Sequence, residues 1–211
     1  MDYSSQRLIP QSLQNYFVKM LTPLIKFLSL RGLSPNSITV AGVVITFIAA
    51  VVLYMGQLRT AGLLILLGGL FDTVDGLIAR NTGKSTRFGA LLDSSLDRYS
   101  EFIILLGSAA YFIHLEEYGT SAGAMVALCG SFMVSYTRAK AESLGFEIKL
   151  GIMQRPERIV LIGLSALIHI TAFKSVIWLV AVLANLTALQ RLRFAYKQDL
   201  TEFKVDPIFE P

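Results

Sequence analysis

The chain has 211 residues, of which 54% are hydrophobic and only 16% are charged. Soluble domains usually carry about a quarter charged residues, so this composition excludes a soluble domain and predicts an all-α polytopic membrane protein. The formal net charge is +4, with 19 Lys and Arg against 15 Asp and Glu. The basic residues are spread along the chain, which argues against a nucleic-acid-binding protein.

The chain begins with an amphipathic stretch, residues 11–30, in which apolar side chains recur at three- and four-residue steps with polar ones between them. It is too polar to span a bilayer, so it predicts a helix that lies in the membrane interface. A soluble helix packed on its own protein is the alternative. We therefore expect residues 1–32 to form an N-terminal interfacial segment. The stretch from Gly32 to Thr39 predicts a turn that leads into the next helix.

Six apolar segments follow, each long enough to cross a hydrocarbon core of about 30 Å as a helix. They cover residues 38–56, 60–81, 89–114, 120–143, 156–173 and 175–196. We expect six transmembrane helices in one domain over residues 33–198, followed by a polar tail over 199–211. Of the 19 basic residues, only Arg59 and Lys174 lie on the side of the shortest connections. The positive-inside rule therefore predicts a multi-pass cell-membrane protein with both termini and the larger connections in the cytoplasm.

Residues 71–97 contain four aspartates at helical spacing. Asp72 and Asp75 are three residues apart, which places both carboxylates on one helix face. Asp93 and Asp97 are four residues apart and share a face of a second helix. Two helices joined by a short connection pack antiparallel, so we expect the two acidic faces to meet.

Four neighbouring carboxylates repel one another strongly unless cations neutralise them. No His or Cys lies nearby, and hard divalent ions prefer oxygen ligands. The pattern therefore predicts a site for two Mg²⁺ ions, with Mn²⁺ as the alternative ion, close to the cytoplasmic side. Small residues beside the aspartates leave room for a bulky ligand, and a basic residue suits its phosphates; these residues are Gly76, Ala79, Gly89 and Arg80.

A second constellation, called here the basic group, borders the connection between the fourth and fifth predicted segments. It consists of Ser135, Arg138, Lys140, Arg155 and Arg158. Arg155 and Arg158 are three residues apart and are expected to point into the same inlet as Arg138 and Lys140. Guanidinium groups match phosphate oxygens, so the group favours a dianionic substrate. The alternative is that these charges only mark the cytoplasmic side.

Other polar residues suggest no chemistry. His114 and His169 are expected at the opposite membrane interface. Cys129, the only cysteine, lies in an apolar run and is predicted to be buried. Arg191, Arg193 and Lys197 are expected to belong to a positive flank that contacts anionic lipid headgroups.

The acidic stretch resembles the signature of the CDP-alcohol phosphotransferase family of membrane enzymes. The matching pattern is Asp72-x2-Asp75-Gly76-x2-Ala79-Arg80-x8-Gly89-x3-Asp93-x3-Asp97. The resemblance implies a CDP-lipid donor, release of CMP, and metal ligation by Asp72, Asp75, Asp93 and Asp97. It also implies that Asp97 accepts the hydroxyl proton of the acceptor. The residues implied for CDP-lipid binding are Pro35, Asn36, Ser37, Asp72, Gly76, Ala79, Arg80, Thr86 and Gly89.

The basic group resembles elements of the phosphatidylinositol phosphate synthase branch of that family, in the runs 135–142 and 155–158. The resemblance covers about residues 33–160 and implies that the basic group binds inositol phosphate as the acceptor. Glycerol 3-phosphate is the alternative acceptor, which would make phosphatidylglycerophosphate. The lipid of the donor is left open between diacylglycerol and archaeol. The resemblance also implies a homodimer.

A divalent-cation transporter is the rival from another class, because carboxylates inside a membrane mark ion paths. It accounts for the aspartates, but it does not account for the adjacent small residues, for Arg80 or for the fixed spacing. Release of CMP from a CDP-lipid by the purified protein separates the two classes.

Overall fold

The computed structural model describes residues 19–23, 25, 34–81, 86–148 and 151–202, and all regular structure within these ranges is helical. The six long helices are α2 (Pro35–Tyr54), α3 (Leu58–Asn81), α4 (Arg87–His114), α5 (Tyr118–Ser143), α6 (Arg155–Ile168) and α7 (Ile170–Glu202). The all-α class predicted from composition is therefore confirmed.

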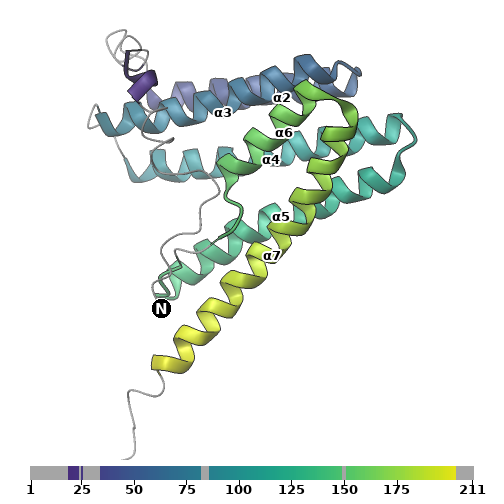
Figure 1. Ribbon diagram of the computed structural model, residues 1–211. Helices are drawn as coiled ribbons and strands as arrows, with labels where there is room; N and C mark the ends of the chain where they lie inside the picture. Colours follow the sequence, from purple (N-terminus) through teal and green to yellow (C-terminus); the bar gives the residue numbers. More distant parts are fainter. Residues whose placement is uncertain (1–18, 24, 26–33, 82–85, 149–150, 203–211) are drawn as a thin grey trace, which may run out of the picture.

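The helices pack in a closed circuit (Figure 1). Helix α2 contacts α3 and α4, α4 contacts α5, α5 contacts α7, and α6 joins α7 back to α3. Helices α3 and α4 barely touch each other directly, because α2 lies between them. The acidic faces of α3 and α4 therefore meet only where the two helices converge with the first turns of α2 and α6.

Close helix contacts are made through small residues, as is common where helices pack in membranes. A Cβ atom on Gly62 of α3 would lie 2.8 Å from the carbonyl oxygen of Gly163 in α6. A Cβ on Gly130 of α5 would lie 2.5 Å from the side-chain nitrogen Nδ2 of Asn185 in α7. Cys129 was predicted to be buried, and this is wrong: it is exposed, one position before the glycine that makes the contact between α5 and α7.

The predicted span at residues 156–173 is also wrong in its bounds. Helix α6 has 14 residues and ends at Ile168, which gives a length of about 21 Å at 1.5 Å per residue. His169 follows in extended conformation, with φ −167° and ψ 156°. Its ring Nδ1 accepts the Thr171 backbone N–H at 3.2 Å. The turn therefore comes at His169 and not between the predicted spans that end at residue 173 and begin at residue 175, and no Gly or Pro marks it.

Three of the described helices are long and apolar enough to cross a membrane by length and composition: they cover Pro35–Tyr54, Leu58–Arg80 and Ile170–Asp199. Helix α7 continues to Glu202, so the residues from 199 to 202 extend this helix and do not start a separate tail. Most of the predicted interfacial helix lies outside the described residues. Of its described part, Leu21 and Ile25 are buried against a cluster that includes Ile78.

Candidate active site

Two helices supply the four carboxylates of the candidate active site, called here the acidic site. Asp72 and Asp75 lie near the end of α3, and Asp93 and Asp97 lie in the first three turns of α4. Asp72, Asp93 and Asp97 each offer one oxygen, and these oxygens lie within 4.8 Å of one another. The predicted meeting of the two acidic faces is confirmed for these three aspartates. Asp75 lies outside this group of three.

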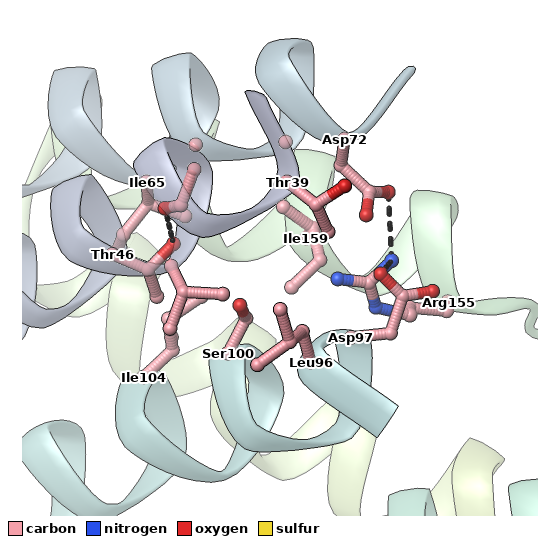
Figure 2. A pocket seen from close by; sticks show the side chains of 14 residues that line it. Thr39, Thr46, Ile65, Asp72, Leu96, Asp97, Ser100, Ile104, Arg155 and Ile159 are labelled. Carbon is pink, nitrogen blue, oxygen red and sulfur yellow. Dashed lines mark hydrogen bonds and ion pairs between the residues drawn. The ribbon is translucent and has the colours of Figure 1, made fainter. Parts of the chain in front are cut away.

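Arg155, the first residue of α6, lies between the two acidic faces (Figure 2). Its Nη1 is 2.7 Å from Asp72 Oδ2 and also 2.7 Å from Asp97 Oδ1. The side chain is 18% exposed. A single guanidinium thus joins α3, α4 and α6 at the acidic site.

Asp75 is 2% exposed, and neither of its carboxylate oxygens has a hydrogen-bond partner of good geometry within the described part of the chain. Thr39 lies beside it, but the Thr39 hydroxyl donates to the Pro35 carbonyl at 3.1 Å. Asp93 Oδ1 is buried and equally without a partner. Buried carboxylate oxygens are normally paired, and an oxygen-only set of this kind suits Mg²⁺ or Mn²⁺. These residues therefore fit a divalent cation.

A pocket of about 350 Å³ opens beside the carboxylates; we call it the donor pocket. Eight of the nine residues expected to bind the CDP-lipid line it: Pro35, Asn36, Asp72, Gly76, Ala79, Arg80, Thr86 and Gly89. The ninth, Ser37, lies in the first turn of α2, where its N–H donates to Oγ of the capping residue Ser34 at 3.2 Å. A Cβ on Gly76 would meet nothing nearer than Arg80 Nη2 at 3.8 Å. Protein packing therefore leaves the bare face of α3 free for a ligand.

Three helices begin at this end of the molecule, and the positive end of a helix dipole suits an anion. Helix α2 begins at Pro35 and α4 at Arg87, where Thr86 Oγ1 accepts the N–H of Gly89 at 2.9 Å. Helix α6 begins at Arg155, and Glu157 Oε2 accepts the N–H of Gln154 at 2.6 Å. The caps fix the first turns that carry the residues around the donor pocket and Arg155.

An apolar groove of about 400 Å³ adjoins the acidic site on its other side, between α3 and α6. Met20, Leu66, Leu70 and Val160 are among its lining residues, and Asp72 and Arg155 lie in the same lining. Such a groove suits hydrocarbon chains whose polar end is held at the carboxylates.

The structure separates the members of the basic group. Arg138 and Lys140 are exposed on α5, and Arg138 Nε donates to Glu142 Oε1 at 2.8 Å. Ser135 is half-buried one turn earlier. Their contact with an acceptor stays a prediction.

Arg158 does not share an inlet with the other arginines, so this part of the prediction is wrong. Its side chain is fully buried. It donates to Glu101 Oε1 at 2.5 Å, to Glu101 Oε2 at 2.9 Å and to the Met153 carbonyl at 3.0 Å. The three-residue spacing from Arg155 turns Arg158 towards α4 because α6 packs one side on α3 and the other on α7. Arg158 therefore clamps α6 to α4.

Arg191 of α7 was expected on a lipid-facing flank, and this is wrong: it is only 5% exposed. Its Nη1 donates to the Val134 carbonyl of α5 at 2.5 Å, and it lies within electrostatic range of Arg138 and Arg158. The sequence carried a signal for this. Arg191 continues a buried stripe of α7 at helical spacing, formed by Val180, Ala184, Thr187 and Ala188.

The model of one protein family, described as CDP-alcohol phosphatidyltransferase, matches residues 32–195. The chain belongs to this family. An archaetidylinositol phosphate synthase from Pyrococcus horikoshii is 37% identical, over 82% of this chain and 89% of the relative. Family membership makes the protein an enzyme and a multi-pass membrane protein.

Two solved structures of one relative resemble this CDP-alcohol phosphatidyltransferase along most of its length. Both are of the phosphatidylinositol phosphate synthase of Mycobacterium tuberculosis, which is 30% identical. The structure with CDP-DAG bound has a TM-score of 0.77 and covers 84% of this chain and 94% of its own. The structure with manganese and citrate has a TM-score of 0.76 and covers 83% and 88%.

Proposed function

We propose that the protein transfers a phosphatidyl-type group from a CDP-lipid, CDP-diacylglycerol or CDP-archaeol, to a hydroxyl of inositol phosphate. Relatives of matching length are named for inositol phosphate products, and a related structure holds CDP-DAG. The observation that carries the proposal is the convergence of three features on Asp72. It lines the donor pocket, it lines the apolar groove, and it contacts Arg155.

The donor would lie with its nucleotide in the donor pocket and its hydrocarbon chains in the apolar groove. The bare face at Gly76 and Ala79 admits the cytidine, and Arg80 lies where the phosphates enter. This arrangement would hold the pyrophosphate beside the carboxylates, between the two compartments.

Two divalent cations, held by Asp72, Asp75, Asp93 and Asp97, would neutralise the pyrophosphate and the departing CMP. The acceptor hydroxyl oxygen attacks the lipid-linked phosphorus, and the bond from that phosphorus to the oxygen of CMP breaks. Asp97 would take the hydroxyl proton, the role that the resemblance implies for it. Asp97, like Asp72, contacts Arg155. Arg155 and the exposed members of the basic group orient the acceptor through its phosphate.

An acceptor panel tests this function. Purified protein with labelled CDP-diacylglycerol and Mg²⁺ should release CMP fastest with inositol 1-phosphate. Faster turnover with free inositol or serine would refute the acceptor, and a preference for glycerol 3-phosphate would establish the alternative synthase. No CMP release from the CDP-lipid with any acceptor would refute the proposed transfer.

We further propose that all six long helices cross the membrane, with both termini and the acidic site on the cytoplasmic side and the N-terminal segment in the interface. The distribution of basic residues supports this orientation. Because α6 is only about 21 Å long, Arg155 would lie below the cytoplasmic surface. The resemblance also supports a homodimer, which cross-linking in membranes would test.

Cysteine labelling checks the orientation. With Cys129 replaced by Ser, single cysteines at Gln57 and Leu144, both exposed in turns, should react with an impermeant reagent from opposite sides. Leu144 should be the cytoplasmic one. Labelling of both from one side would contradict the six crossings.

A further inference from the structure

Arg155 is bound to the carboxylates that are suited to the cation, yet its guanidinium is only partly satisfied. Its Nη1 lies 2.7 Å from both Asp72 Oδ2 and Asp97 Oδ1, as Figure 2 shows. Its Nε is buried and has no hydrogen-bond partner among the described residues. A buried donor without an acceptor is unfavourable, so this side chain has a free place for a further oxygen.

A divalent cation and Arg155 compete for the same two carboxylates, those of Asp72 and Asp97. A cation bound to either of these oxygens would lie about 2 Å from it. The cation and Nη1 would then be at most about 5 Å apart, two positive charges among side chains that are only 18–27% exposed. They repel strongly at this distance. Asp72 and Asp97 therefore bind the cation tightly only when the Arg155 guanidinium moves away from them. They bind the guanidinium tightly only when the cation is absent.

We propose that Arg155 acts as an internal counter-ion that competes with the divalent cation for Asp72 and Asp97, and that the phosphate of the acceptor draws it away. The second half rests on the proposed function, because it takes inositol phosphate as the acceptor. Arg155 is the first residue of α6, and the clamp formed by Arg158 and Glu101 holds this helix in place. The exchange therefore needs only a change of the Arg155 side chain.

The exchange links two binding events. If the acceptor phosphate removes Arg155 from the carboxylates, the acceptor raises the affinity for the cation. By thermodynamic reciprocity the cation raises the affinity for the acceptor by the same factor.

The first test measures Mn²⁺ binding by electron paramagnetic resonance of free Mn²⁺, without any substrate. Arg155→Gln should bind Mn²⁺ about tenfold more tightly than the wild type, because it removes the competing charge. Arg155→Lys keeps the charge and should stay closer to the wild type. The matched control is Arg59→Gln, an exposed residue on the same helix as Asp72 and about 20 Å along it, which should change nothing. Equal or weaker Mn²⁺ binding by folded Arg155→Gln would overturn the proposal.

The second test repeats the titration with inositol 1-phosphate and no CDP-lipid, so that no turnover occurs. The acceptor should raise the Mn²⁺ affinity of the wild type and of Arg59→Gln by about tenfold, and that of Arg155→Gln by less than about twofold. If inositol 1-phosphate binds but leaves the Mn²⁺ affinity of the wild type unchanged, the proposed linkage between acceptor binding and cation binding is overturned. If inositol phosphate does not bind at all, the proposed acceptor is wrong, while the first test still decides whether Arg155 competes with the cation.

Discussion

The sequence predicts both the acidic site and the basic group as clusters of charge, but the fold pairs their side chains to different degrees. Asp75 is buried, and neither of its carboxylate oxygens has a hydrogen-bond partner among the described residues; the same holds for Asp93 Oδ1. Arg158, in contrast, has three donated hydrogen bonds inside the protein. The fold leaves the acidic site to be completed by ligands, whereas it uses part of the basic group to hold helices together.

Members of the basic group also differ from one another in exposure and in pairing. Arg138 is 57% exposed and is paired only with Glu142 on its own helix, whereas Arg158 is fully buried against a different helix. A charge that is available to a substrate and a charge that stabilises the fold have the same appearance in the sequence. Variants at these positions should separate the two roles.

The largest effect is expected at the acidic site. Asp93→Asn alters a carboxylate whose buried Oδ1 has no hydrogen-bond partner among the described residues, so the fold should be retained. Turnover should fall at least about a thousandfold, because cation binding is worth several kcal/mol to the transition state. CMP release measures the loss of turnover, and thermal unfolding of the same preparation shows whether the fold is retained. More than about a tenth of wild-type activity, or full activity in EDTA, would contradict the role of the acidic site as a cation site.

The next effect is on stability. Arg158→Met leaves Glu101 buried without its partner and should lower the free energy of unfolding by about 3–5 kcal/mol. The double variant Glu101→Leu with Arg158→Met should recover most of that loss, since apolar pairs often replace buried ion pairs without cost. Thermal unfolding in detergent measures both.

The double variant also decides between the two roles of Arg158. If Arg158 bound the acceptor directly, the double variant would be stable but would show a strongly raised acceptor KM. A clamp predicts an acceptor KM within about threefold of the wild type once stability is restored.

The acidic site could be predicted from the sequence because its residues follow one helical period on two adjoining helices. Asp72 and Asp93 come together through local geometry and one short connection. Arg158 and Arg191 could not be placed in this way, since their partners, Glu101 and the Val134 carbonyl, are 57 residues away in the chain. The bend at His169 was missed because the residues on both sides of it are apolar and none is a Gly or Pro.

A smaller effect is expected at the exposed end of the basic group. If Arg138 binds the acceptor phosphate, Arg138→Gln removes one charge-assisted hydrogen bond, which contributes about 1.5–3 kcal/mol. The acceptor KM should therefore rise roughly ten- to a hundredfold, with the CDP-lipid KM unchanged. Thermal stability should stay the same, because exposed ion pairs contribute at most about 1 kcal/mol. Glu142→Gln is the control: it breaks the same ion pair, keeps Arg138, and should leave the acceptor KM unchanged. Equal effects of the two variants would mean that Arg138 does not touch the acceptor.

The smallest effect is expected at the face of α3 that lines the donor pocket. Two glycines of this helix can be compared, one that faces the pocket and one that packs against α6. A Cβ on Gly76 has open space around it, whereas a Cβ on Gly62 would lie 2.8 Å from the Gly163 carbonyl oxygen and 3.0 Å from Ala166 Cβ. Gly76→Ala should keep or slightly raise the unfolding temperature, because Ala is the better helix former. It should raise the CDP-lipid KM about three- to tenfold and leave the acceptor KM unchanged, which corresponds to about 1 kcal/mol, the lower end of the cost of one added methyl group in a close-fitting pocket. Gly62→Ala should do the reverse, with about 1–3 kcal/mol lost in stability through overpacking and normal substrate KM values. If Gly76→Ala and the larger Gly76→Val both leave the CDP-lipid KM unchanged, the nucleotide does not lie against this face of α3.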